Sequence, residues 1–152
     1  MANEGQFSVL EIRALGWPDS VQLPRERFRL FVAADTTQTT TEQIAAFTQA
    51  ALQMGMVYCC AWGPGCERFH DIVDEVSAAR ELDGLQAPTP EDTIMTTWHK
   101  DESLEEALEF FGQWARPTDG YAANSNYWLV VCAGHPEWAS TAAKYLQANR
   151  LM

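Results

Sequence analysis

Cysteine and histidine, the side chains best suited to nucleophilic and acid–base chemistry near neutral pH, lie close together in CCAWGPGCERFHD (59–71). Cys66 follows a glycine-rich turn where a helix is expected to begin. Unpaired N–H groups and the dipole at a helix start stabilise an anion, so we predict a lowered thiol pKa and a nucleophilic Cys66. His99 is the predicted general base, with His135 as the other candidate. The alternative is an inert, half-buried thiol between helix and sheet.

The same stretch also suggests a metal site. Cys66, His70 and Asp74 recur at every fourth position, so they share one stripe of the expected helix. Zinc prefers cysteine and histidine ligands, and His99 or Asp101 could complete a tetrahedral set. The chain has neither a CxxC pair nor an HExxH motif, and the acids fit the solvated side of an amphipathic helix equally well. We therefore predict no cofactor, with zinc as the alternative.

Four apolar runs are the expected strands that position these residues, and a segment with helical periodicity follows each run. The strands are expected at 28–34, 56–62, 93–99 and 127–133, and the helices between Thr40 and Gly55, at 66–80, at 103–115 and at 136–147. This alternation predicts an α/β fold: a mostly parallel sheet of four to five strands with helices on both faces, in three doubly wound layers. We expect one domain over 1–152. Residues 1–27 are less clear, and an edge strand in QFSVLEIRAL is favoured over a short helix.

The carboxyl ends of parallel strands meet at one edge of a sheet, and ligands bind there. All three histidines of the chain follow predicted strands, so we expect a common rim at this edge. Beside the candidate catalytic pair Cys66 and His99, the predicted ligand-binding residues are Asp35, Trp62, Gly63, Gly65, His70, Trp98, Asp101 and His135. The sequence therefore predicts a small-molecule or metal site, either catalytic or simply binding.

An acidic binding surface is the competing interpretation. The chain carries 21 acidic and 10 basic residues, a net charge of −11, which disfavours binding to nucleic acids and to anionic membranes. Thirteen of the acids fall within 67–109. If the helices at 66–80 and 103–115 were neighbours on one face, they would form a negative patch that attracts a basic protein, as in an inhibitor or immunity protein. Exposed tryptophans at 17, 114 or 138 would then be anchors.

The cellular compartment can also be inferred from the sequence. No continuous apolar stretch approaches the ~20 residues needed to cross a bilayer, and the first residues lack the basic region of a secretory signal. We therefore expect a cytoplasmic protein with no membrane partner and with its four cysteines reduced.

Two resemblances accompany these patterns. The stretch AWGPGCERFHDIVDE (61–75) is similar to the thioredoxin segment in which a strand ends in W-C-G-P-C and a helix follows. Gly63 stands where the attacking cysteine would be, so this resemblance implies a similar turn shape rather than dithiol chemistry. C-A-W-G-P-x-C-E-x-x-H-D together with T-T-W-H resembles a family of uncharacterised small acidic bacterial proteins, over most of the chain from residue 28. That resemblance implies an α/β domain of bacterial origin with no assigned activity.

Overall fold

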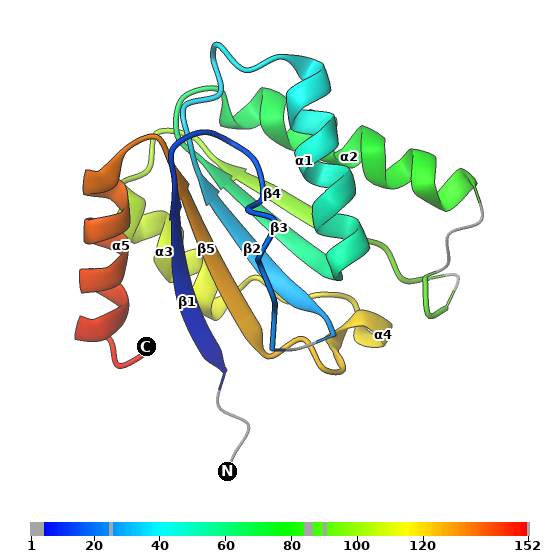
Figure 1. Ribbon diagram of the computed structural model, residues 1–152. Helices are drawn as coiled ribbons and strands as arrows, with labels where there is room; N and C mark the ends of the chain where they lie inside the picture. The colour runs from blue at the N-terminus through cyan, green and yellow to red at the C-terminus, as the bar shows by residue number, and fades with distance from the viewer. Residues whose placement is uncertain (1–4, 25, 84–86, 90, 152) are drawn as a thin grey trace.

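A five-stranded sheet forms the centre of the computed structural model, which describes residues 5–24, 26–83, 87–89 and 91–151 (Figure 1). Every strand pair is parallel, and the strand order is β1–β5–β2–β3–β4. The strands are β1 (Gln6–Ile12), β2 (Phe28–Ala33), β3 (Met56–Trp62), β4 (Met95–His99) and β5 (Tyr127–Ala133). The predicted α/β fold is confirmed, and the favoured N-terminal edge strand is β1.

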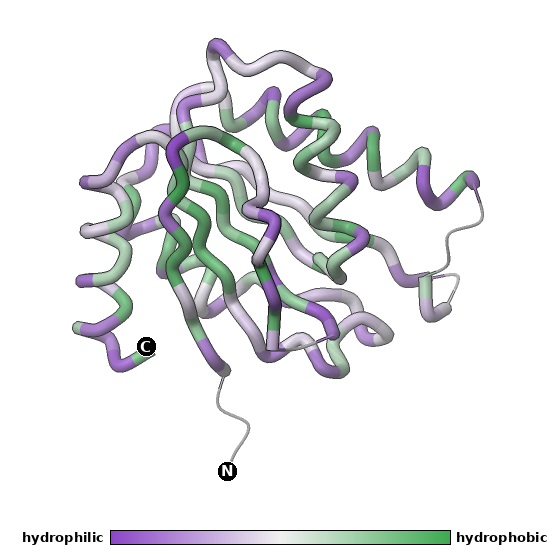
Figure 2. Tube along the Cα trace, in the orientation of Figure 1, coloured by the Kyte–Doolittle hydropathy of each residue, from purple (hydrophilic) through white to green (hydrophobic). Residues whose placement is uncertain are grey.

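Helices cover both faces of this sheet. They are α1 (Thr41–Met54), α2 (Cys66–Leu82), α3 (Leu104–Gln113), the short α4 (Asp119–Ala122) and α5 (Pro136–Ala148). The apolar sides of α1 and α2 pack in one core cluster, and those of α3 and α5 pack in another on the opposite face. Figure 2 shows mostly hydrophobic residues along the central strands, and hydrophobic and hydrophilic residues in alternation along the helices. The three predicted layers are therefore present.

Strand alternation assigns side chains to the two cores. Leu30 and Val32 of β2 point toward α1 and α2, whereas Phe31 and Ala33 point toward α3 and α5. Every residue of β5 is buried, because a central parallel strand is covered on both sides. This explains why the strands appear in the sequence as continuous apolar runs.

The connection from β1 to β2 packs on the α1 face. The Trp17 ring stacks on Phe47 with centroids 4.7 Å apart, and its indole N–H donates to the Phe47 carbonyl at 3.0 Å. Trp17 is thus a packing residue rather than an exposed anchor.

The expectation that the two acidic helices are neighbours on one face of the sheet is wrong. α2 packs beside α1, and α3 packs beside α5 on the other face. The reason is the strand order: the chain moves outward from β3 to the edge strand β4 and then returns to β5. Right-handed crossovers in opposite directions must lie on opposite faces of a sheet. The acids of α2 and α3 therefore flank β4 from two sides and do not form one patch.

Candidate functional site

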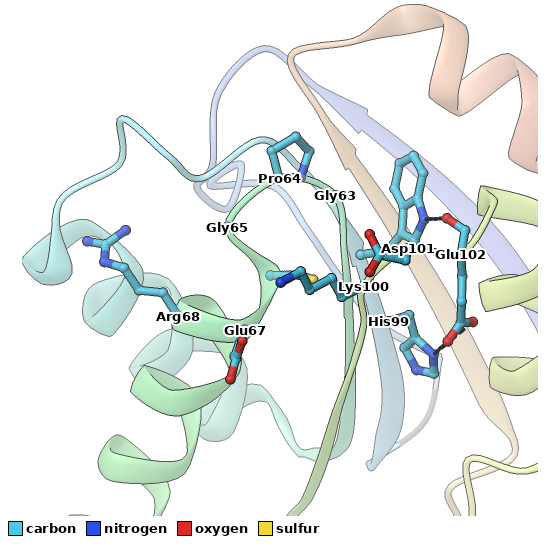
Figure 3. A pocket seen from close by; sticks show the side chains of 11 residues that line it. Gly63, Pro64, Gly65, Glu67, Arg68, His99, Lys100, Asp101 and Glu102 are labelled. Atoms are coloured by element: carbon cyan, nitrogen blue, oxygen red, sulfur yellow. Dashed lines mark hydrogen bonds and ion pairs between the residues drawn. The ribbon is translucent and has the colours of Figure 1, made fainter.

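A cavity of about 450 Å³ opens at the carboxyl ends of β3 and β4 (Figure 3). β3 continues into α2 on one face and β4 continues into α3 on the other, so their loops diverge and leave a cleft. Clefts of this kind are where open parallel sheets bind ligands. The cavity is lined by residues 62–68 and 99–102. Of the residues predicted to form the site, it brings together Trp62, Gly63, Gly65, Cys66, His99 and Asp101.

The Gly-Pro-Gly turn shapes one wall of this cavity. Gly63 and Gly65 have φ of 110° and 84°, in the left-handed region that side chains disfavour. A Cβ on Gly63 would collide with the Ala34 carbonyl oxygen, and one on Gly65 would lie 2.6 Å from the Thr36 hydroxyl. The glycines thus allow the β3–α2 loop to pack directly on the loop after β2.

Donor groups face the cavity from the start of α2. Gly65 is the N-cap of α2 and offers no side-chain cap, whereas α1 and α3 each begin with a complete capping box. The first amides of α2 therefore have no side-chain cap from the N-cap position. Lys100 extends from the opposite loop toward this helix start (Figure 3). The Arg68 guanidinium turns away and donates to the carbonyls of Thr36 and Thr39, at 3.1 and 2.8 Å.

Cys66 does not have the predicted activated thiol. Its side chain is only 4% exposed and belongs to the core between α2 and the sheet. Burial raises the pKa of the Cys66 thiol, and this desolvation outweighs the backbone hydrogen bonds from His99, Cys66 and Glu67, which act in the opposite direction. The prediction of a lowered pKa is wrong, and the alternative of a buried thiol describes the geometry.

His99 is directed away from Cys66. Its ring is 6% exposed and packs on Phe110, with Nδ1 3.3 Å from the Glu102 carboxylate and Nε2 2.9 Å from the Thr97 hydroxyl. Thr97 in turn donates to Cys60, which lies in the core beneath α3 and α5. The His99 imidazole therefore faces α3, while the Cys66 thiol faces the α1 side. The structure does not assemble the predicted nucleophile–base pair.

The other two histidines lie apart from this cavity. The His70 ring packs on Trp98 with centroids 4.4 Å apart and faces the carboxylates of its neighbours Asp71 and Asp74, at 3.0 and 3.6 Å. His135 stacks on Trp138 at 3.9 Å, at the end of β5, and lines a separate hollow with residues 11–13. The expected common rim of three imidazoles and a thiol is therefore not formed.

Asp35 also has a local role. Its carboxylate accepts hydrogen bonds from the backbone N–H and the hydroxyl of Thr37, at 3.0 and 2.6 Å. These bonds, chiefly the one from the hydroxyl, lower the pKa of Asp35, and the charge of His135 adds to the effect. Asp35 thus lies at the carboxyl ends of β2 and β5 and outside the cavity.

No metal site is formed by the described residues, which exclude 1–4, 25, 84–86, 90 and 152. Among them, no three histidine, cysteine or acidic side chains cluster in a way that could hold a metal ion.

Five residues that line the cavity were not predicted from the sequence. Three of them, Pro64, Glu67 and Arg68, belong to the β3–α2 side, and the other two are Lys100 and Glu102. Both lie in the loop after β4, where Asp101 adopts a φ of 64°. The Glu102 carbonyl accepts the Trp62 indole N–H at 2.9 Å and so joins the two loops that form the cavity. The sequence could have indicated Lys100 and Glu102 as site residues, because they flank Asp101 directly after a predicted strand.

Residues 12–148 match a protein family described as a domain of unknown function, DUF7684. The chain belongs to the DUF7684 family. The match includes both loops of the cavity and confirms that the chain comes from an uncharacterised family. No curated protein and no solved structure matches this DUF7684 chain. Within the described part of the chain, no helix combines the length and apolarity required to cross a membrane.

Proposed function

We propose that this DUF7684 domain binds a small polar molecule non-covalently in the cavity between the β3–α2 and β4–α3 loops. The observation that carries the proposal is the position of the cavity, where two parallel strands send their loops to opposite faces. Its volume of about 450 Å³ falls within the range of small-molecule sites. The buried Cys66, with its raised thiol pKa, favours binding over covalent catalysis.

The lining defines the chemistry of the ligand. Lys100 and the start of α2, which has no N-cap side chain, offer positive charge and the positive end of a helix dipole, which suit an anionic group. Glu67 and Asp101 offer carboxylate acceptors on the same cavity. A molecule that carries both an anionic group and a hydroxyl or amino group would satisfy both sets.

Amide chemical-shift mapping tests this proposal. The probes are a panel of small amino acids, hydroxy acids and sugar phosphates, added singly to isotope-labelled protein. At least one probe should shift the amides of 63–67 and 100–102 in a saturable manner. Lys100→Ala should weaken that binding about tenfold, because hydrogen bonds to charged groups contribute ~1.5–3 kcal/mol.

The matched control is Lys144→Ala, which removes the other lysine of the chain, a residue on α5 far along the sequence from both cavity loops. Binding to this variant should be unchanged. Shifts that gather elsewhere, equal losses in both variants, or a panel without any response would each overturn the proposal.

A further inference from the structure

β4 is an open edge of the sheet. It pairs with β3 on one side, and no strand lies beyond it in the described part of the chain. Natural edge strands are usually protected against further pairing by charged residues or proline. β1, at the other edge, carries Glu11 near its end, whereas the β4 sequence MTTWH contains no lysine, acid or proline. β4 is therefore suited to accept an additional strand.

The same edge exposes large apolar side chains. Met95 and Trp98, near the two ends of β4, are 37% and 42% exposed. The Trp98 ring rests on His70 of α2, so one of its sides is supported while the rest faces solvent. A supported tryptophan beside unpaired backbone groups is a typical anchor for a protein partner.

Carboxylates surround this edge from both sides. On the α2 side, Asp74 accepts a hydrogen bond from Thr96 of β4 at 3.1 Å, and Asp71 lies beside His70. On the α3 side, Glu102 faces His99. Acids occur on both sides because α2 and α3 cover opposite faces of the sheet, which meet at β4.

Charge selects the kind of strand that fits. A second copy of this chain, itself with a net charge of −11, would bring the same carboxylates against one another. A lysine- or arginine-rich segment would instead place its cations against Asp71 and Asp74 on one side and Glu102 on the other. Side chains of an extended segment alternate between the two sides, so cations at successive positions can reach both groups of acids.

We propose that the edge of β4 binds an extended basic segment of a partner protein as a sixth strand, with Trp98 as the side-chain anchor. Main-chain hydrogen bonds to β4 supply affinity, and the flanking acids supply selectivity for cations. This interaction surface adjoins the cavity between the β3–α2 and β4–α3 loops, and Glu102 belongs to both, whereas Asp71, Asp74 and Trp98 lie outside the cavity lining.

A synthetic peptide about as long as the five-residue β4, with lysines at two successive central positions and valines elsewhere, tests the proposal. Its affinity is measured by calorimetry, and protection of the β4 amides by hydrogen exchange. A second peptide carries N-methyl groups at alternate residues, which keep the charges but remove main-chain donors. The unmodified peptide should bind and protect β4 amides, and N-methylation should weaken binding about tenfold or more.

Two tryptophan variants complete the test. Trp98→Ala should weaken peptide binding about tenfold, because anchor residues carry most of the binding energy. Trp114→Ala is the matched control, since Trp114 is 64% exposed but lies at the end of α3. Circular dichroism establishes that both variants are folded.

Several outcomes would overturn the proposal. These are no binding of the unmodified peptide, equal binding of the N-methylated peptide, or equal effects of the two tryptophan variants. Light scattering could also contradict the proposal. If the wild-type protein were a dimer and Trp98→Ala were a monomer, a second copy of the chain, rather than a basic segment, would occupy the β4 edge.

Discussion

At the scale of single residues, the Cys66 thiol is subject to two opposing influences. The start of α2 favours its anionic form, and removal from water disfavours it. Desolvation dominates because the thiol points into the apolar core rather than along the helix axis toward solvent. Position at a helix start is thus insufficient to activate a cysteine when its rotamer directs the sulfur inward.

The native protein should therefore react slowly with iodoacetamide at neutral pH. All four cysteines are buried and unpaired, and burial raises the pKa of Cys60 and Cys132 to about 12. Labelling of Cys66 should rise only as the pH exceeds the usual thiol value of ~8.5, and unfolding in urea should release all four thiols. Mass spectrometry counts the labels. A single thiol that reacts rapidly at neutral pH, and is absent in Cys66→Ala, would contradict this expectation.

Asp92 is a second residue with a defined electrostatic role. Its carboxylate accepts hydrogen bonds from the hydroxyls of Thr118 and Thr89 and from the Gly120 amide, and so ties the loop before β4 to α4. The Thr118 bond, followed by the Thr89 bond, lowers the pKa of Asp92. Because the folded pKa is the lower one, this stabilisation is present above the unfolded value of ~3.9 and is lost as the pH falls through the folded pKa.

Asp92→Asn should therefore lower the free energy of unfolding at neutral pH and have a smaller effect in strong acid. Urea denaturation at both pH values measures the difference. Asp119→Asn, which changes another acid in the first turn of α4, is the control and should have little effect at either pH. An equal loss of stability at both pH values would show that the Asp92 charge is not the cause.

At the scale of elements, the β3–α2 loop determines the shape of the cavity. Gly63→Ala should destabilise the protein by more than ~1 kcal/mol, because the residue must keep a positive φ and its Cβ would meet the Ala34 carbonyl. Gly16→Ala is the matched control, since a Cβ added at Gly16 would meet no atom within 4 Å. Urea denaturation compares the two. Equal stabilities would refute the close packing of the β3–α2 loop on the loop after β2.

Much of this element structure was predictable from local signals. The capping boxes at Thr40 and Ser103, and the stop at Gly55, are present in the structure. The place of the cavity was also predictable, because the ends of parallel strands share one edge. Strand side chains alternate between the two faces, so Thr97 and His99 must share one face. The surroundings of His99 could then have been predicted, but only with the knowledge that α3 covers this face.

At the scale of the whole molecule, charge is spread over both faces. The excess of 11 negative charges repels itself most strongly in the compact state. Added salt shortens the screening length from ~30 Å at 0.01 M to ~3 Å at 1 M.

The melting temperature should therefore rise with sodium chloride over this range. Neutralising two acids of α3, in Glu105→Gln/Glu109→Gln, should raise the melting temperature at low salt and reduce its salt dependence. Differential scanning calorimetry measures both. A melting temperature that falls with salt would show that attractive ion pairs outweigh the net repulsion.

The sequence by itself determined the type and order of the elements apart from the short α4, and it located loops 63–65 and 99–102 at one edge of the sheet. Apolar runs, helix caps and glycine turns are local, so they act wherever the chain later packs. Only the tertiary structure decided the strand order, which placed α2 and α3 on opposite faces and left β4 open. It also decided the burial of Cys66 and its separation from His99, because burial and facing depend on which helix covers each side of a strand.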